Sequence, residues 1–212
     1  MPATRDASGP ATAKGEATRA FLLRTAAAVF AEHGYTATTM GDLISASGLT
    51  KGAFYFHFRS KADLALAVVA DQQGRWIGHV REQVGARPGA AGLRAVVPVM
   101  LEMIEREPGA WSITRLTQEL ATEPGVGPAA CRFLAEWVDM IADLVRRGQA
   151  GGEVAADLDP DAVAAVLVGA FDGLKALTGA LAVAGAAGAD PQAQFRHRAQ
   201  TLFTLVERSL LG

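Results

Sequence analysis

The chain has 212 residues, half of them hydrophobic, and a formal net charge of −2 from 20 basic and 22 acidic side chains. This length suits one large domain, or a small domain joined to a larger one. The slightly acidic balance excludes a protein that binds nucleic acid through an overall positive charge, so such binding would require a local basic patch.

The first predicted elements are a polar tail and two helices. Residues 1–15 contain no apolar run and are expected to form a disordered tail rather than a signal peptide. Residues 16–33 place apolar side chains at the spacing of one helix face. The next helix is predicted to begin at Thr39, which forms a capping-box pair with Asp42, and to end at Gly48.

Two further helix starts follow closely in the sequence. Thr50 is a natural cap for a short helix that reaches about Phe58. Ser60 and Asp63 form another capping pair, which opens a long helix to about residue 84. The later helices are predicted over residues 91–106, 108–121, 128–147, 160–181 and 191–210.

These patterns predict an all-α fold of about nine helices, with no strand and no internal repeat. The most apolar run, residues 162–171, is shorter than the ~20 residues that cross a bilayer, so no membrane partner is expected.

The stretch GLTKGAFYFHFRSKADL, residues 48–64, crowds aromatic rings among cations. A helix, a glycine and a second short helix within about twenty residues is the layout of a helix-turn-helix. Because so short a helix is marginal alone, two of its rings, Phe54 and Phe58, are expected to anchor it in a three-helix core. The alternative is that all the rings are core and the cations form a solvated edge.

In a helix-turn-helix the amino end of the second helix enters the major groove. Lys51 is a suitable donor to guanine, and the small Gly52 and Ala53 allow the backbone to approach the duplex. Tyr55 is expected to point away from the core toward a phosphate. The residues that would face or flank the groove are Thr50, Lys51, Gly52, Ala53, Tyr55, His57 and Lys61.

The segment TTMGDLISASGLTKGAFYFHFRSKADL resembles the DNA-binding domain of the TetR family of bacterial transcriptional regulators, over about residues 17–65. Phe54 replaces a usual Leu, and Phe56 replaces a frequent Tyr, which removes one phosphate-binding hydroxyl. The run Thr-Lys-Gly-Ala-x-Tyr-Phe-His-Phe is similar to the γ-butyrolactone receptor branch. The resemblance implies a DNA-binding domain over residues 16–62 and a ligand-binding and dimerisation domain over residues 63–212. It also implies that Thr39 is a DNA contact, together with Thr50, Lys51, Tyr55, His57 and Lys61.

The resemblance also implies an inducer pocket in the middle helices. Aromatic rings and methionines suit a small apolar ligand, although ordinary core packing is the alternative for each residue. Trp137 stands in FLAEWVDM, which looks like the segment that carries a pocket tryptophan in butyrolactone receptors. The candidate ligand residues are Trp137, Trp111, Met100, Met103, Phe133, Met140 and Gln118.

TetR-like regulators are homodimers whose last two helices form a four-helix bundle. Gly169 and Gly173 lie on one face of an apolar helix, where each costs ~1 kcal/mol unless a close neighbour compensates. The candidate interface residues are Val163, Leu167, Gly169, Ala170, Gly173, Leu174, Phe203 and Val206.

The expected function is that of a cytoplasmic regulator, a repressor that binds a palindromic DNA operator as a homodimer and is released by the ligand. The ligand would tilt helix 60–84 and move the two DNA-binding domains apart. Two alternatives stay open: an activator of the same fold, and a dimeric helical scaffold that does not bind DNA.

An enzyme is not expected. The sequence contains none of the motifs HExxH, GxGxxG, CxxC, GxSxG or a Walker loop. The four histidines have no metal-ligand spacing, and the single cysteine, Cys131, has no neighbouring base in the sequence. No metal or cofactor is therefore expected.

Overall fold

A computed structural model describes residues 13–106, 110–186 and 190–210, and for residues 110–112 the backbone alone. Every regular element in these ranges is a helix, which confirms the all-α prediction. The helices are α1 (Ala13–His33), α2 (Met40–Ser47), α3 (Lys51–His57), α4 (Lys61–Val84), α5 (Gly89–Arg106), α6 (Ala110–Ala121), α7 (Gly127–Ala130), α8 (Arg132–Ala150), α9 (Pro160–Val183) and α10 (Pro191–Leu210).

The predicted capping residues begin and end the short helices. The Thr39 hydroxyl accepts a hydrogen bond from Asp42 N, while Asp42 Oδ2 accepts from Thr39 N at 2.8 Å. Gly48 ends α2 in the left-handed conformation, with φ 65°. The Thr50 hydroxyl accepts from Ala53 N at 3.3 Å. The backbone geometry of the helix-turn-helix is therefore fixed by local hydrogen bonds.

Two hydrophobic cores are joined through α4. Leu64 and Val68 lie in a core with α1, α2, α3 and α6, whereas Trp76 and Val80, farther along the same helix, lie in a second core with α5, α8, α9 and α10. The helix continues without a break across residue 62, where the sequence placed a domain boundary. A tilt of α4 would therefore change the side-chain packing in both cores.

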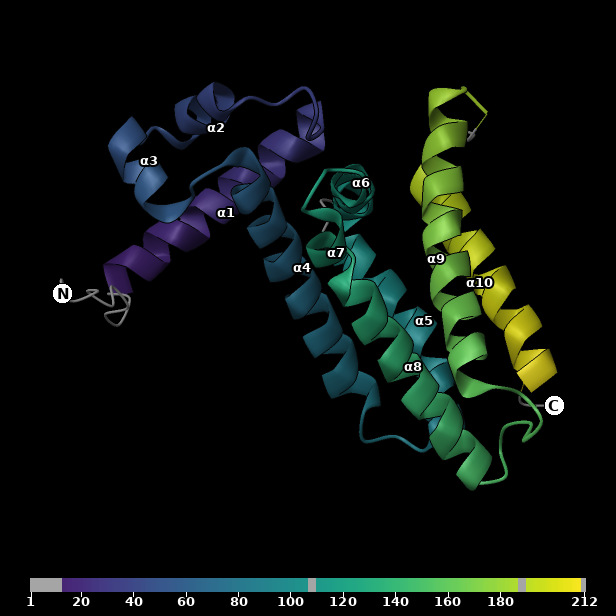
Figure 1. The fold of residues 1–212 in the computed structure, drawn as a ribbon. Helices are drawn as coiled ribbons and strands as arrows, with labels where there is room; N and C mark the ends of the chain where they lie inside the picture. The colour runs from purple at the N-terminus through teal and green to yellow at the C-terminus, as the bar shows by residue number, and fades with distance from the viewer. Residues whose placement is uncertain (1–12, 107–109, 187–189, 211–212) are drawn as a thin grey trace, which may run out of the picture.

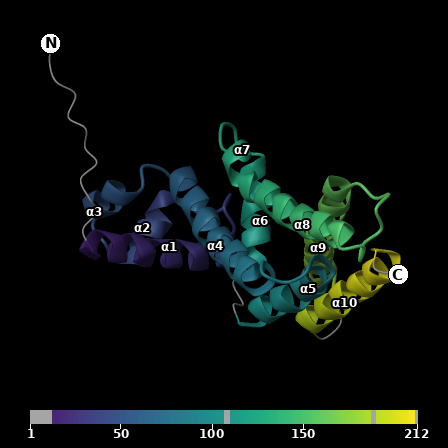
Figure 2. The same cartoon turned by 90° about the horizontal axis from the view of Figure 1, so that it is seen from below.

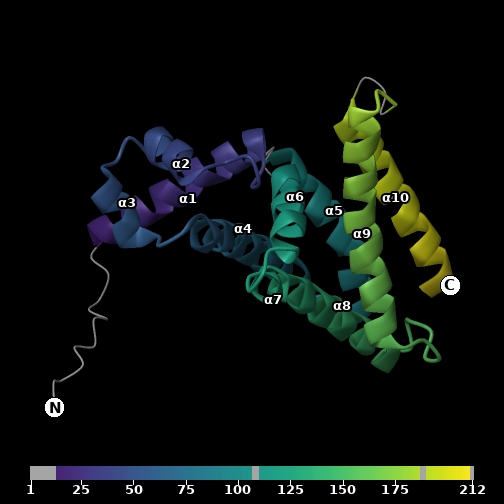
Figure 3. The same cartoon turned by 45° about the horizontal axis from the view of Figure 1, so that its top comes forward.

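The molecule is elongated, with α1–α3 at one end and the pair α9–α10 at the other (Figure 1). The helices α4, α5, α6 and α8 lie between them, as the turned views in Figures 2 and 3 also show. The exposed surface of α3 therefore lies at the opposite end of the molecule from the exposed surface of α9.

The structure corrects the predicted helix over residues 128–147. The chain forms α7 and α8 separately, because Cys131 adopts φ −90° and ψ −4° and tightens the chain through a hydrogen bond from Leu134 N to Cys131 O. At its other end α8 continues through Gly148 to Ala150, beyond the predicted end at residue 147. Gly148 lies against Gly89, at the start of α5.

This crossing of α5 and α8 permits no side chain at Gly89. A Cβ atom there would lie 2.0 Å from Gly148 N and 2.5 Å from Gly148 Cα. We expect Gly89→Ala to lower the free energy of unfolding by about 1–3 kcal/mol, because backbone atoms must shift. In the matched variant Gly74→Ala the new methyl meets nothing within 4 Å, so it should raise stability by about 0.4–1 kcal/mol. Urea unfolding measures both, and a stabilising Gly89→Ala would contradict the close approach.

The helix α9 is longer than the apolar run of residues 162–171, from which no membrane span was expected. It has 24 residues and an 18-residue window of mean hydropathy 1.6, which is long and apolar enough by length and composition. The sequence prediction ended the apolar run at Asp172, whereas the helix continues and pairs Asp172 with Lys175. Length and composition alone are weak evidence for a membrane span. Only 17% of that window is buried, so α9 presents an apolar face that is uncovered in the single chain.

Candidate nucleic-acid interface and cavity

The amino end of α3 is exposed, and its opposite side is anchored. Lys51, Gly52 and Ala53 are all exposed. Phe54 and Phe58, one helical turn apart, are each 1% exposed in the core with α1 and α4. The predicted anchoring by two rings is therefore confirmed, and the side of α3 that carries Lys51 is free to contact another molecule.

Three other side chains flank this end. Tyr55 is 40% exposed, and its ring lies edge-on to Phe54 at 6.4 Å. His57 is partly buried, and the ring of Phe56 lies edge-on to it at 5.2 Å. Phe56 is 84% exposed. The sequence interpretation gave Phe56 no role beyond a lost hydroxyl, although so exposed a ring beside Tyr55 is available for apolar contact with a duplex.

Lys61 points back toward the protein. Its Nζ donates to the carbonyl oxygens of Tyr35 and Thr38, both at 2.8 Å, and lies 4.2 Å from the centre of the Tyr35 ring. An ammonium has three donors, so one remains for a phosphate. Lys61 therefore also holds the loop between α1 and α2, and its contact with a phosphate stays a prediction.

Glu119 of α6 holds the same loop from the other side. Its Oε2 accepts from Tyr35 N at 2.8 Å and Thr36 N at 3.0 Å, and its Oε1 accepts from Arg115 Nε at 2.9 Å. Burial raises the pKa of Glu119, but hydrogen bonds from Thr36, Arg115 and Tyr35 outweigh it and leave the pKa below its ordinary value. Sequence analysis missed this contact, because 84 residues separate its partners.

Removing the Glu119 carboxylate should destabilise the protein. Glu119→Ala leaves two backbone N–H donors without their acceptor, so we expect a loss of about 1–3 kcal/mol in urea unfolding at neutral pH. The matched variant Glu102→Ala removes only an exposed i,i+4 partner of Arg106, and should cost less than about 0.5 kcal/mol.

The pH dependence gives a second readout. Because the folded pKa lies below the unfolded value of about 4.3, this contribution is complete above that value and is lost as the pH falls through the folded pKa. The difference between wild type and Glu119→Ala should therefore shrink in acid. A difference that stays constant down to that range would contradict the role of the charge.

A cavity of about 460 Å³ lies among α4, α5, α6, α8, α9 and α10. Four of the predicted ligand residues line it: Met100, Gln118, Phe133 and Trp137. Met103 and Met140 do not line it, because both are packed in the surrounding core. The side chain of Trp111 lies outside the described residues.

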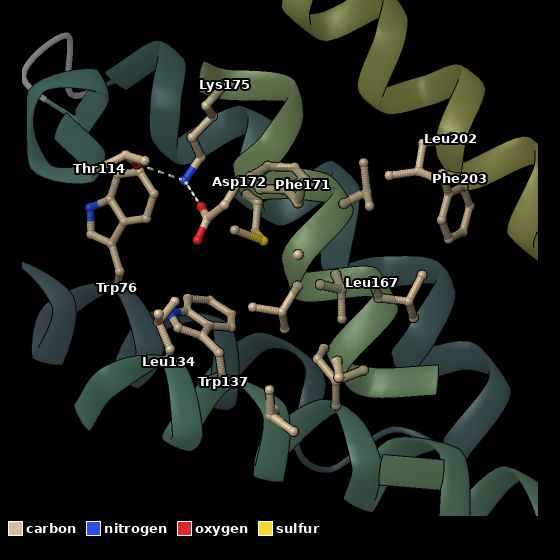
Figure 4. Close-up of a pocket in the computed structure, with 18 of the residues that line it drawn as sticks. Trp76, Thr114, Leu134, Trp137, Leu167, Phe171, Asp172, Lys175, Leu202 and Phe203 are labelled. Carbon is tan, nitrogen blue, oxygen red and sulfur yellow. Dashed lines mark hydrogen bonds and ion pairs between the residues drawn. The ribbon is translucent and has the colours of Figure 1, made fainter. Parts of the chain in front are cut away.

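The wall also contains residues that sequence analysis did not select. Trp76 and Gln73 come from α4, three residues apart on one face. Lys175 and Asp172 come from α9, and Thr114 comes from α6 (Figure 4). The sequence signal that could have identified these polar residues was a lysine within an apolar helix, because a buried cation requires hydrogen-bonding or anionic partners.

The predicted interface residues divide into two groups. Gly169 and Gly173 are exposed on α9, and a Cβ at either would meet nothing within 4 Å. The others, Val163, Leu167, Ala170, Leu174, Phe203 and Val206, are partly buried. Leu167, Phe203 and Val206 line the cavity, and so does Gly169 of the exposed group. The exposed apolar surface contains instead Val166 and Leu177 of α9 and Leu205 of α10, which are 67%, 48% and 60% exposed.

No group of three or more histidine, cysteine, aspartate or glutamate side chains in the described ranges could hold a metal ion.

Two family profiles match the chain. "Bacterial regulatory proteins, tetR family" covers residues 22–68, and "Tetracyclin repressor-like, C-terminal domain" covers residues 90–183. The structure of TylP, a TetR regulator from Streptomyces fradiae, superposes with a TM-score of 0.64 at 33% identity, over 93% of this chain and 88% of that one. The chain belongs to the TetR family of bacterial transcriptional regulators. It is accordingly a regulator and not an enzyme.

Two relatives extend the comparison of this TetR-family chain. The HTH-type transcriptional repressor Rv1474c of Mycobacterium tuberculosis is 29% identical over 197 residues, which is 92% of this chain and 93% of that protein. The A-factor receptor protein of Streptomyces griseus is 28% identical over 154 residues, 73% of this chain. That match spans 52%, about half, of the receptor's own length.

Proposed function

We propose that the chain is a cytoplasmic repressor that binds a palindromic DNA operator as a homodimer and is released by a small apolar ligand. The observation that carries this proposal is the amino end of α3. Lys51 is exposed there, next to the small residues Gly52 and Ala53, while Phe54 and Phe58 hold the other side of the helix in the core. This geometry suits insertion of the helix end into a major groove.

The proposed contacts differ in what they provide. Lys51 donates to a base edge and gives sequence preference. Thr50, Tyr55 and His57 lie at or beside the same helix, and Thr39 is the exposed cap of α2, so these residues contact phosphates and fix the register. Lys61 uses two donors on carbonyl oxygens of the chain itself and acts mainly by positioning the loop before α2.

The proposed dimer uses the exposed face of α9 together with α10. Val166, Gly169, Gly173 and Leu177 follow one another at three- and four-residue spacing on α9, and all are exposed. The two glycines leave room for a close helix neighbour. When an apolar face of this kind is left uncovered in a single chain, it is typical of a protein–protein interface. A second copy of the chain would cover it and place two α3 helices on one duplex.

Ligand response would pass through α6 as well as α4. Ile113, Leu116 and Leu120 of α6 pack in the core with α1–α3, whereas Thr114 and Gln118 of the same helix line the cavity. Glu119 adds the hydrogen bonds to the loop before α2. A ligand that binds better when α6 is displaced would weaken DNA binding through this helix.

Repression is proposed because Rv1474c, which matches nearly the whole chain, is named a repressor. The A-factor receptor by its name binds a small molecule, which supports a ligand for the cavity. We retain the proposed division into residues 16–62 for DNA binding and residues 63–212 for ligand binding and dimerisation, with α4 extending from one into the other.

Selection of DNA from random duplexes tests the proposal. The protein should enrich an inverted repeat whose half-sites are centred about one helical turn apart, or a multiple of it. Enrichment of no sequence would favour the scaffold alternative. A reporter placed behind the selected operator then distinguishes repression, with lower expression when the protein is present, from activation.

A further inference from the structure

The cavity wall is mostly apolar, and its polar side chains other than Glu207 of α10 come from α4, α6 and α9. Leu202, Phe203 and Leu167 come from α10 and α9, whereas Lys175 and Asp172 lie beside Trp76 at the end next to α6 (Figure 4). The wall therefore distinguishes the two ends of an elongated ligand.

We infer that the ligand is an uncharged amphipathic molecule whose oxygen-bearing head accepts hydrogen bonds from Lys175 and Gln73, with its apolar body against Trp137 and Phe133. This inference rests on the proposed function, because it assumes that the cavity holds a ligand. It adds the chemical class of that ligand and the residues that select it.

Lys175 has an available donor. Its side chain is 8% exposed, and Nζ donates to Asp172 Oδ1 at 2.9 Å and to Thr114 Oγ1 at 3.3 Å. Rings of Trp76 and Phe171 lie 5.7 and 5.0 Å from it. An ammonium has three donors, so one lacks an oxygen acceptor among the described residues. A carbonyl, ether or hydroxyl oxygen in the cavity would accept it.

Gln73 supplies a second polar group. It is 8% exposed, lines the cavity, and its side chain makes no hydrogen bond to another residue of the described ranges. Its amide atoms are not among the fully enclosed side-chain atoms that lack a partner, so they are accessible from the cavity, where a ligand or a water molecule can bond to them. It lies one helical turn before Trp76 on α4, on the face toward Lys175.

The charges of the wall argue against an anionic head. Asp172 is already the partner of Lys175, and the other acidic residue, Glu207, pairs with Arg94 at 2.7 Å. A carboxylate near Lys175 would lie beside Asp172 with no cation left to neutralise it. Burial of an unpaired charge is costly, whereas an uncharged acceptor adds no charge.

Two probes of equal carbon number test this inference. Binding of methyl nonyl ketone and of undecanoate is followed by tryptophan fluorescence, since Trp76 and Trp137 line the cavity. At neutral pH we expect the wild type to bind the ketone at least about tenfold more tightly. Asp172→Asn should invert or abolish this preference, because Lys175 then lacks its anionic partner.

Other variants separate charge from packing. Lys175→Met combined with Asp172→Asn removes both charges, avoids an unpaired aspartate, and should weaken ketone binding about tenfold. Gln73→Leu should weaken it several-fold. The control Arg81→Met changes one exposed cation outside the cavity wall and should leave both affinities unchanged.

Equal affinity of the wild type for both probes, or an unchanged ratio in Asp172→Asn, would overturn the inference and leave the cavity as a ligand site. Binding of neither probe would count against both the inference and the proposed ligand response. DNA binding without ligand, measured separately by gel shift, would stand in either case.

Discussion

Lys51→Ala should weaken operator binding by between about 30-fold and 10⁴-fold. The estimate follows from about 1–3 kcal/mol for a lysine contact to a base edge, counted once in each half-site of a dimer. Binding to unrelated DNA should fall far less, because phosphate contacts provide most non-specific affinity. A gel shift with operator and with scrambled duplex measures both quantities.

The matched variant is Arg81→Ala, which removes an exposed cation from the far half of α4. It should leave operator affinity within about threefold, since its charge lies beyond a Debye length from the proposed groove contact. Equal losses on operator and scrambled DNA in Lys51→Ala would instead assign Lys51 to a phosphate. Tyr55→Phe is expected to produce that uniform loss, because its hydroxyl contacts the backbone only.

Val166→Glu together with Leu177→Glu should convert the proposed dimer into monomers. Both residues are exposed on α9, and the change places two carboxylates from each copy in an apolar contact, which is costly without a cation. Sedimentation should show the monomer mass, and operator affinity should fall by at least about a hundredfold, because the second half-site is no longer tethered to the first.

The control Ala135→Glu adds a carboxylate at an exposed position of α8, away from this face, and should remain dimeric. Leu167 and Phe203 are poor sites for the same test, because they line the cavity and a charge there would also affect ligand binding. A dimer that persists in Val166→Glu with Leu177→Glu would move the interface elsewhere.

Local chemistry explains what sequence analysis predicted well. Thr39 with Asp42, Gly48 and Thr50 act within four residues of their partners, so their spacing alone predicts the ends of α2 and α3. Phe54 and Phe58 follow the helical repeat, and both are buried as predicted. The same reasoning located the middle helices, whereas the four predicted residues that line the cavity followed from the resemblance to the TetR family.

Contacts between distant segments explain what was missed. Glu119 and Tyr35 are 84 residues apart, and no local pattern pairs them. Lys61 is suitably placed for DNA in the sequence, but the folded loop offers its ammonium two carbonyl oxygens. Leu167 has the same apolar periodicity whether it lies at an interface or on a cavity wall, so only packing distinguishes the two.

The two faces of α9 also could not be assigned from the sequence, because periodicity does not show which apolar face is buried in the chain itself. Its apolar residues surround the helix, and the sequence assigned Val163, Leu167 and Leu174 to the interface. The structure turns these three toward the chain's own core and leaves Val166 and Leu177 exposed. Helical periodicity predicted the stripe, but the choice of direction depended on how α8 and α10 pack against it.

The most direct test of the central claim combines Lys51 with single-atom changes in the selected operator. Replacing guanine by 7-deazaguanine removes the N7 acceptor from the major groove, while inosine removes the amino group from the minor groove. We predict that 7-deazaguanine at one position in each half-site weakens wild-type binding and has no further effect in Lys51→Ala. A loss caused by inosine alone, or an equal loss from 7-deazaguanine in both proteins, would contradict entry of the α3 amino end into the major groove.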